Sequence, residues 1–410
     1  MSENSSSYTS SNGDNVELEG DIINNYNIIA LLGKGAYSLV WLAYNVSDGK
    51  YYALKVQNPN DFDDGKDEIR ILKQIPKDEK YINKLVEYFI ETRIIDDKPV
   101  NFICSVYDLC CGNLDGLARK GKYKKGYPED LVKKLFKQIL LSLDTVHNKL
   151  NGFHGDIKPD NILLCGLNHR DSKYIQMYDK ANFTSIYNKT KKEYCAEKNI
   201  TKIKSELKTK IRRKIHQAII GMMDDNNEDQ YTCDDKYFEN PIIKLTDFGF
   251  FCPNSEKFND SFGTRYYMAP EIVLMGDCSD KVDIWALGCM LYELLTGEIL
   301  FDPHSSKRGN TDFHHLEMII NLCGDFNKYY SKEILKQMKY YKKYFKNEKL
   351  VNIIYNDDFK LDTIDKITNK LKNHNFNNPL VCDLIESCLR ISSRSRPSVK
   401  EILNHPWLTQ

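Results

Sequence analysis

Apolar residues follow two different spacings along this chain. Between residues 26 and 107 they form short, strand-like runs separated by polar and glycine-containing turns. We predict strands at 26–32, 38–44, 51–57, 85–92 and 101–108, with one helix near 66–74. The first part of the chain is therefore predicted to form a small sheet with one helix.

Helical spacing begins at about residue 114. Its clearest example is a set of apolar residues at three-to-four-residue steps, which would form one face of a helix: Leu131, Leu135, Ile139, Leu143 and Val146. A sheet region followed by a mainly helical region is typical of an α+β architecture. We expect a small β-rich N-terminal lobe over 23–109 and a larger, mainly helical C-terminal lobe over 110–165 and 242–408, with a cleft between them.

Two segments lie outside this pattern. Residues 1–22 are largely Ser, Asn and acidic residues without periodicity, so we predict a disordered tail. Residues 166–241 form an insertion that is too long for a plain loop. Within it, Ile and Leu recur at helical spacing from Ile200 to Ile219, among many Lys and Arg residues. Two interpretations are open: a solvated helix that packs on the helical lobe, or a basic element for partner binding or localisation.

Composition narrows the possible functions. The 410 residues include 58 Lys and Arg against 58 Asp and Glu, and this zero net charge predicts neither a nucleic-acid nor a membrane partner. The first residues lack the pattern of a signal peptide, and no apolar run is long enough to span a membrane. We therefore expect a monomer in the cytosol or nucleus. The 12 cysteines include no Cys-x-x-Cys, so neither a zinc site nor a disulfide framework is predicted.

The most informative chemistry lies between His154 and Asn161. This stretch places a carboxylate (Asp156), an ammonium (Lys158) and an amide (Asn161) on one short loop. These groups are suited to moving a phosphoryl group from ATP to a hydroxyl. The apolar residues 162–164 follow directly and predict a short buried strand, which would anchor the loop on a rigid element.

A glycine-containing segment, residues 33–38, lies between two predicted strands. Its small residues would let backbone N–H groups approach triphosphate oxygens, although alone the segment is more typical of an ordinary hairpin turn. Lys55 on the next strand would reach the α- and β-phosphates. Such a lysine needs a carboxylate, and helical spacing favours Glu68 over its neighbour Asp67, which would point about 100° away. Asp247 follows the apolar strand 242–245 and suits Mg²⁺.

Two further motifs, at 263–271 and 280–288, complete an ordered set of parts. From about residue 26 to 408 the chain resembles a eukaryotic-type protein kinase. The resemblance implies that ATP and Mg²⁺ are the cofactors, that Asp156 is the catalytic base assisted by Lys158, and that Asn161 and Asp247 hold the metal. It also implies a set of nucleotide contacts: Leu32, Gly33, Lys34, Gly35, Ala36, Tyr37, Ser38, Leu39, Val40, Ala53, Lys55, Glu68, Asp108, Cys110 and Leu163.

The same resemblance implies four structural roles. It suggests an ion pair between Glu271 and Arg396 and a bracing role for Asp283 behind the catalytic loop. It also suggests that Tyr107 guards the back of the nucleotide pocket and that residues 108–110 form the adenine-binding hinge. Ordinary core or surface packing is the alternative for each of these residues.

Lys158, two residues after Asp156, together with Thr264, resembles kinases that phosphorylate serine and threonine. A narrower resemblance is to the kinases of serine/arginine-rich splicing factors. It is carried by Ser38 in place of a third glycine, residues 41–42, residues 67–69, the long insertion, and residues 315–320 followed by 330–333. Two features differ from that group. Met268 replaces an arginine, and lysines dominate residues 328–349, which would repel an Arg-Ser tract. We therefore hypothesise altered or relaxed substrate choice.

Gly155 stands where many kinases have an arginine that grips a phosphorylated activation loop. We hypothesise that this enzyme needs no activation-loop phosphate. Two other functions compete with a protein kinase: a pseudokinase scaffold that binds partners through the insertion, and a small-molecule kinase. The full set of candidate catalytic residues argues against the first, and the segment 263–271 argues against the second.

Overall fold

The computed structural model describes residues 18–35, 37–95, 97–223, 230–256, 261–305, 309–346, 349–350 and 363–410. The chain divides into two compact units. Unit 1 consists of Met1–Lys73, Asn83–Cys111 and Gly166–Asp234, and unit 2 consists of Gln74–Ile82, Gly112–Cys165 and Asp235–Gln410. Each unit is assembled from segments that are far apart in the sequence.

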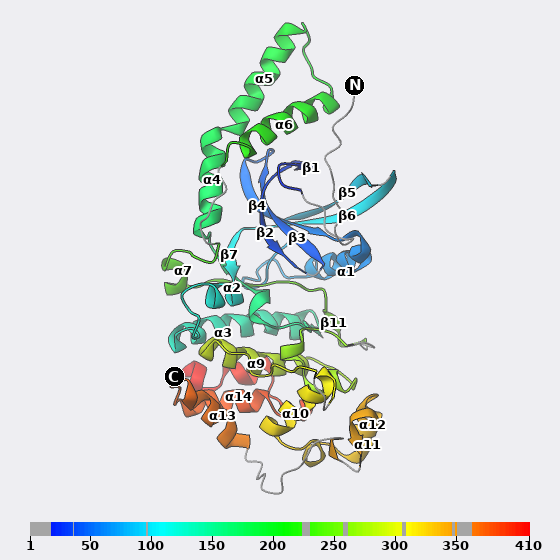
Figure 1. The fold of residues 1–410 in the computed structure, drawn as a ribbon, viewed down its shortest axis with the longest axis vertical. Coiled ribbons are helices and arrows are strands. Elements are labelled where there is room, and N and C mark those ends of the chain that lie inside the picture. Colours follow the sequence, from blue (N-terminus) through cyan, green and yellow to red (C-terminus); the bar gives the residue numbers. More distant parts are fainter. Residues whose placement is uncertain are drawn as a thin grey trace. The chain divides into compact units, whose positions relative to one another are not determined.

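Unit 1 is built on a six-stranded antiparallel sheet with the strand order β1-β2-β3-β4-β6-β5 (Figure 1). The strands are β1 (Ile22–Ile23), β2 (Tyr26–Lys34), β3 (Ser38–Asn45), β4 (Lys50–Gln57), β5 (Glu87–Ile95) and β6 (Lys98–Tyr107). The helix α1 (Phe62–Leu72) follows β4. The five predicted strands and the predicted helix are therefore present, with ends that differ by a few residues.

The structure corrects the end of the predicted disordered tail. Residues 1–17 lie outside the described residues, but residues 18–22 belong to the fold. Leu18 is buried in the core of the sheet, and Ile22 lies in β1, which pairs with β2. Ile23, the other residue of β1, is buried as well, so this short edge strand is held by apolar side chains in an otherwise polar stretch.

Both faces of the sheet are covered. One face buries Ile28, Trp41, Ala43 and Leu54. The other face buries Ile29, Ala30, Leu42 and Tyr44. Consecutive residues of a strand point to opposite faces, so a strand buried on both faces is apolar at nearly every position. This explains the unbroken apolar runs at 28–32 and 39–44.

The second face is covered by helices of the insertion, α4 (His169–Ala181), α5 (Phe183–Glu197) and α6 (Ser205–Ile220). Tyr174, Tyr178, Phe183 and Ile219 pack with the strand residues Ile29, Ala30, Leu42 and Tyr44. Helix α6 confirms that the apolar spacing after residue 200 is helical. The expectation that this helix packs on the helical lobe is wrong, because its buried contacts are with the sheet of unit 1.

Unit 2 is mainly helical. The predicted apolar face is confirmed, since Leu131, Leu135, Ile139, Leu143 and Val146 are all buried, the first four of them in α3 (Glu129–Asp144). The helix α9 (Lys281–Thr296) is buried along almost its entire length and forms the centre of this unit. The α+β class is therefore correct: one unit is β-rich and the other is mainly helical.

The other elements are helices of up to 13 residues and strands of two to four residues. The helices are α2 (Leu114–Arg119), α7 (Lys236–Glu239), α8 (Pro270–Val273), α10 (Thr311–Cys323), α11 (Lys332–Gln337), α12 (Tyr341–Tyr344), α13 (Thr363–Asn373), α14 (Pro379–Cys388), α15 (Val399–Leu403) and α16 (Pro406–Thr409). The strands are β7 (Cys110–Asn113), β8 (Gly152–Phe153), β9 (Ile162–Cys165), β10 (Ile243–Leu245), β11 (Cys252–Pro253), β12 (Phe345–Lys346) and β13 (Lys349–Leu350).

Candidate functional site

In unit 2 the loop between β8 and β9 gathers the three predicted side chains. The Lys158 ammonium donates to Asp156 Oδ2 and to Thr264 Oγ1, both at 2.7 Å. The Asn161 amide nitrogen donates to the Asp156 backbone oxygen at 2.8 Å and to its Oδ2 at 3.1 Å. Asp156 Oδ1 is buried and has no hydrogen-bond partner among the described residues. One carboxylate oxygen is thus fixed by two donors, and the other is left without a donor in the described ranges.

A buried carboxylate holds this loop from behind. Asp283, from α9, accepts hydrogen bonds from the backbone N–H groups of His154 (2.8 Å) and Gly155 (2.9 Å) and from His147 Nε2 (2.8 Å). Burial would raise the pKa of Asp283, but the bond from His147, the nearby His154 and the Gly155 N–H outweigh it and lower the pKa. The bracing contact suggested for Asp283 is therefore present. Sequence reasoning missed His147.

The two candidate metal ligands follow from strand pairing. In the antiparallel pair β9–β10, Ile162 lies opposite Leu245, and the Thr246 N–H donates to the Asn161 backbone oxygen at 3.0 Å. Asn161 and Asp247 therefore lie at the same end of this short ladder, one residue before Ile162 and two residues after Leu245. Asp247 has a φ of +67°, which is unusual for a residue other than glycine and is typical of functional positions.

An amide oxygen and a carboxylate are the hard ligands that Mg²⁺ prefers, so these two residues fit that ion. No group of three or more His, Cys, Asp or Glu side chains suited to a metal occurs in the part of the chain that the structure describes. A Mg²⁺ ion here would hence complete its shell with phosphate oxygens and water, as this ion usually does.

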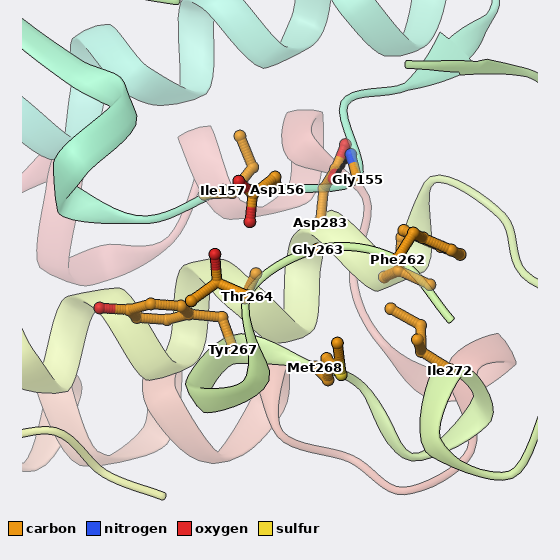
Figure 2. A pocket seen from close by; sticks show the side chains of 12 residues that line it. Gly155, Asp156, Ile157, Phe262, Gly263, Thr264, Tyr267, Met268, Ile272 and Asp283 are labelled. Carbon is orange, nitrogen blue, oxygen red and sulfur yellow. Dashed lines mark hydrogen bonds between the residues drawn. The ribbon is translucent and has the colours of Figure 1, made fainter. Parts of the chain in front are cut away.

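A small pocket lies beside Asp156, and Figure 2 shows the side chains that line it. Thr264 and Tyr267 lie on the side of the pocket nearer to Asp156, while Phe262, Met268 and Ile272 give the rest an apolar lining. Gly263, at a φ of +77°, packs so closely on the catalytic loop that a Cβ atom would lie 2.5 Å from the Gly155 oxygen. The segment is therefore held against Asp156.

The end of this segment is fixed by a buried ion pair. Arg396 donates from Nη1 and Nη2 to the two carboxylate oxygens of Glu271, at 2.6 and 2.8 Å. Both side chains are almost fully buried. The ion pair that the resemblance suggested is present.

Gly155 is the loop position without a side chain. It has a φ of +84°, and a Cβ atom would lie 2.7 Å from the Phe250 backbone oxygen. This close approach and this backbone conformation both favour glycine.

In unit 1 the Lys55 ammonium donates to both carboxylate oxygens of Glu68, at 2.7 and 2.9 Å. Glu68 is 6% exposed, whereas Asp67 faces solvent and pairs with Arg70. The choice of Glu68 from helical spacing is therefore the pairing that the structure shows.

The strand register aligns the glycine-containing segment with this pair. Gly33 lies opposite Val40, and Val40 lies opposite Lys55 on the next strand. The Gly35 N–H donates to the Ser38 oxygen at 2.9 Å and closes the turn. Ala36 lies outside the described residues. The other predicted nucleotide contacts lie on β2 (Leu32, Lys34), in the turn (Tyr37), on β3 (Leu39), on β4 (Ala53), after β6 (Asp108), at the start of β7 (Cys110) and, in unit 2, on β9 (Leu163).

Known proteins that are similar to this chain are protein kinases. The protein kinase domain family matches residues 26–196 and 232–408. A protein named as a serine/threonine-protein kinase in Acanthamoeba polyphaga mimivirus is 26% identical, over 93% of this chain and 87% of the relative. The serine/threonine-protein kinase SRPK of Physarum polycephalum is 31% identical, over 77% of this chain and 71% of the relative. Protein kinase dsk1 of Schizosaccharomyces pombe is 25% identical, over 74% of this chain and 66% of the relative.

Protein kinases use ATP, typically with Mg²⁺, to phosphorylate proteins. None of the helices in the described ranges is both long and apolar enough to cross a membrane. The chain belongs to the protein kinase family and is a serine/threonine protein kinase that resembles the kinases of serine/arginine-rich splicing factors.

Proposed function

We propose that the chain transfers the γ-phosphoryl group of Mg²⁺-ATP to Ser and Thr hydroxyls of proteins, with Asp156 as the catalytic base. The observation that carries this proposal is the asymmetry of the Asp156 carboxylate: Oδ2 is held by Lys158 and Asn161, and Oδ1 is buried without a partner. An oriented carboxylate of this kind can accept a hydroxyl proton as the phosphorus–oxygen bond forms.

The other residues take charge-handling roles in this proposal. Lys158 neutralises charge on the transferred group, and Lys55, aimed by Glu68, binds the α- and β-phosphates. When bound, Mg²⁺ supplies positive charge to the phosphates, and Asn161 and Asp247 would hold it. The remaining nucleotide contacts predicted from the sequence keep their proposed roles toward the phosphates and the adenine.

The experiment is phosphate transfer from labelled ATP to a protein substrate by the wild type and by Asp156→Asn. The substitution should lower kcat by at least about 10²- to 10⁴-fold, the usual contribution of a positioned acid–base group. Binding of a non-hydrolysable ATP analogue should be unchanged. A wild type that binds the analogue but transfers no phosphate would instead support the pseudokinase scaffold.

We further propose that substrate choice differs from the kinases of serine/arginine-rich splicing factors. Seven lysines around α11 and α12 are exposed: Lys328, Lys332, Lys336, Lys339, Lys342, Lys343 and Lys346. Met268 is buried in the apolar lining of the pocket, in the place of an arginine. A surface of this charge would repel an Arg-Ser tract.

Phosphorylation of an Arg-Ser repeat peptide can be compared with that of a generic basic protein. We expect no strong preference for the repeat. Replacing Lys339 and Lys343 by Glu should lower KM for the repeat, whereas the exposed Lys400→Glu on α15 serves as the control. Strong selective use of the repeat by the wild type would overturn this view.

We also propose that activity does not depend on activation-loop phosphorylation. No side chain at Gly155 can grip a phosphate, and the close approach of Phe250 leaves no room for one. Ser255, Ser261 and Thr264 are the serine and threonine residues between Asp247 and Glu271 that the structure describes. Phosphatase treatment of the purified enzyme should leave its activity unchanged, and loss of activity would refute the proposal.

Protein substrates are the expected partners, and we propose a monomer of the cytosol or nucleus that binds no nucleic acid. The balanced charge of the chain supports this. Light scattering of the purified protein and imaging of the tagged chain in its own cells would test the two parts separately.

A further inference from the structure

The insertion is anchored at its base in unit 1. Asn168 caps α4, and its amide nitrogen donates to the Cys111 oxygen at 3.2 Å. The two ends of the insertion meet here, because the His169 N–H donates to the Thr232 oxygen and Asn168 bridges to Cys233. Helix α4 therefore starts from a fixed point, and so the side chains that follow have defined positions.

Two residues further on, Arg170 reaches strand β2. Its Nη2 donates to the Leu31 backbone oxygen at 2.7 Å, its Nη1 donates to Gln230, and its guanidinium lies over the Tyr174 ring. The pairing of β2 with β3 is irregular between Leu31 and Gly33, immediately before the glycine-containing turn. A rigid, planar donor thus holds a carbonyl oxygen at the point where the ladder is interrupted.

Helix α6 contacts the first residues of the same strand and the turn that precedes it. Arg212 donates from Nη1 to the Asn24 oxygen and from Nε to Asn27 Oδ1, both at 2.7 Å. His216 Nε2 bonds to the Ile28 backbone oxygen at 2.8 Å, and its Nδ1 bonds to the Tyr178 hydroxyl at 3.0 Å. The Ile28 oxygen can only accept, so Nε2 carries the proton.

These contacts begin in the turn before β2 and continue along the strand at three-to-four-residue steps: Asn24, Asn27 with Ile28, and Leu31. Each is made by a residue of the insertion, and the last lies two residues before Gly33. Buried hydrogen bonds from guanidinium groups are stronger and more directional than bonds between neutral groups. The insertion is therefore hydrogen-bonded along the strand that leads into the glycine-containing turn.

We propose that the insertion is a clamp that positions this turn for the phosphates of ATP, with Arg170 as the positioning residue at its end. The inference rests on the proposed function, in which the turn binds the triphosphate. It assigns the insertion a part in nucleotide recognition within unit 1. Arg170 acts through the Leu31 carbonyl and does not itself touch ATP.

The test separates phosphate recognition from adenine recognition. Calorimetry of Arg170→Ala with a non-hydrolysable Mg²⁺-ATP analogue should give a Kd about tenfold higher than that of the wild type, since one strong hydrogen bond no longer orders the turn. The Kd for adenosine should not change. Arg170→Lys, which keeps a charged donor, should recover part of the analogue affinity.

Lys180→Ala is the matched control, because Lys180 is an exposed cation on the same helix. It should leave both dissociation constants unchanged. Relative to the wild type, the folded Arg170→Ala protein should show faster amide hydrogen exchange in residues 31–35, with a smaller change or none in β4. A fall in affinity for both ligands, or for neither, would overturn the clamp. Failure of the wild type to bind the analogue would instead refute the proposed function.

Discussion

Each unit buries an arginine, and the two guanidinium groups are compensated differently. In unit 2, Arg396 makes a two-pronged ion pair with Glu271 and also donates to backbone oxygens of Lys281, Arg390 and Ile391. In unit 1, Arg212 is 8% exposed and bonds to an amide oxygen and a backbone oxygen, both neutral. Its Nη2 is buried without a hydrogen-bond partner in the described ranges. Burial lowers the pKa of Arg212 to about 10.

The difference separates two kinds of attachment. Arg396 joins segments inside one core, where a full counter-charge offsets the cost of burial. Arg212 joins an inserted helix to a pre-existing sheet, where the desolvation of its charge is offset only by neutral acceptors. We therefore expect the contacts of Arg212 to contribute less to the free energy of unfolding than the Glu271–Arg396 ion pair does. Four predictions test this ranking.

The largest effect is expected for Glu271→Gln. It leaves the Arg396 charge buried without a counter-ion and should lower the free energy of unfolding by about 3–5 kcal/mol. Urea denaturation measures the change. Asp383→Asn, which removes an exposed carboxylate from an ion pair, is the control and should change stability by less than about 1 kcal/mol. If both variants lost a similar amount of unfolding free energy, the buried ion pair would not be more important for stability than an exposed one.

The second prediction concerns pH and His216. Burial lowers the pKa of His216 to about 4, although its bond to the Ile28 oxygen acts in the opposite direction. Between that value and the ordinary 6.5 the unfolded chain binds a proton that the folded chain does not, so stability is complete above about pH 6.5 and falls as the pH drops toward 4. The fall from this group should reach about 3 kcal/mol.

His216→Gln should flatten this part of the stability profile. Arg212 on the same helix and Asp21 near the sheet are the charged groups around His216. His315 in unit 2 also has a pKa lowered by burial, to about 3, so His315→Gln is the comparison variant. The stability of α6 can be followed by its amide hydrogen exchange as a function of pH. The prediction for His216 would be contradicted if His216→Gln had the same pH dependence as the wild type.

Arg212→Met should cost less than Glu271→Gln. It removes a poorly compensated charge but leaves Asn27 Oδ1 and the Asn24 oxygen without a donor, so we expect a loss of about 1–2 kcal/mol. Arg213→Met, at the next and more exposed position, should be close to neutral. A loss for Arg212→Met as large as that for Glu271→Gln would show that a counter-ion is not what distinguishes the two arginines.

The smallest net effect is expected for Asn27→Asp, which gives Arg212 the carboxylate it lacks but removes the hydrogen bond that Asn27 Nδ2 donates to the Tyr178 hydroxyl. The new pair should stabilise the protein by about 1 kcal/mol at neutral pH, and the gain should disappear in acid as the carboxyl group is protonated. The same change in the Arg212→Met background should be destabilising. A gain that persists without Arg212 would mean that the charge pair is not its source.

Much of the fold could be predicted because its signals are local. Period-two and period-3.6 spacing located the five long strands and α3, and the position of Glu68 on the inward face of α1 selected it over Asp67. The order of the motifs around Asp156 indicated phosphoryl transfer before any contact was known. The unbroken apolar runs of β2 and β3 also contained a signal that the sheet is covered on both faces.

What covers the second face was decided only by the tertiary structure. Helix α6 meets the sheet through a polar network in which Arg212 and Asn27, 185 residues apart in sequence, form a hydrogen bond. Such contacts have no periodicity, and the many lysines nearby suggested a solvated helix instead. The sequence by itself determined the elements and the chemistry, because both depend on neighbouring residues. The surface that the insertion covers depends on which distant polar groups satisfy one another, and only the folded chain brings them together.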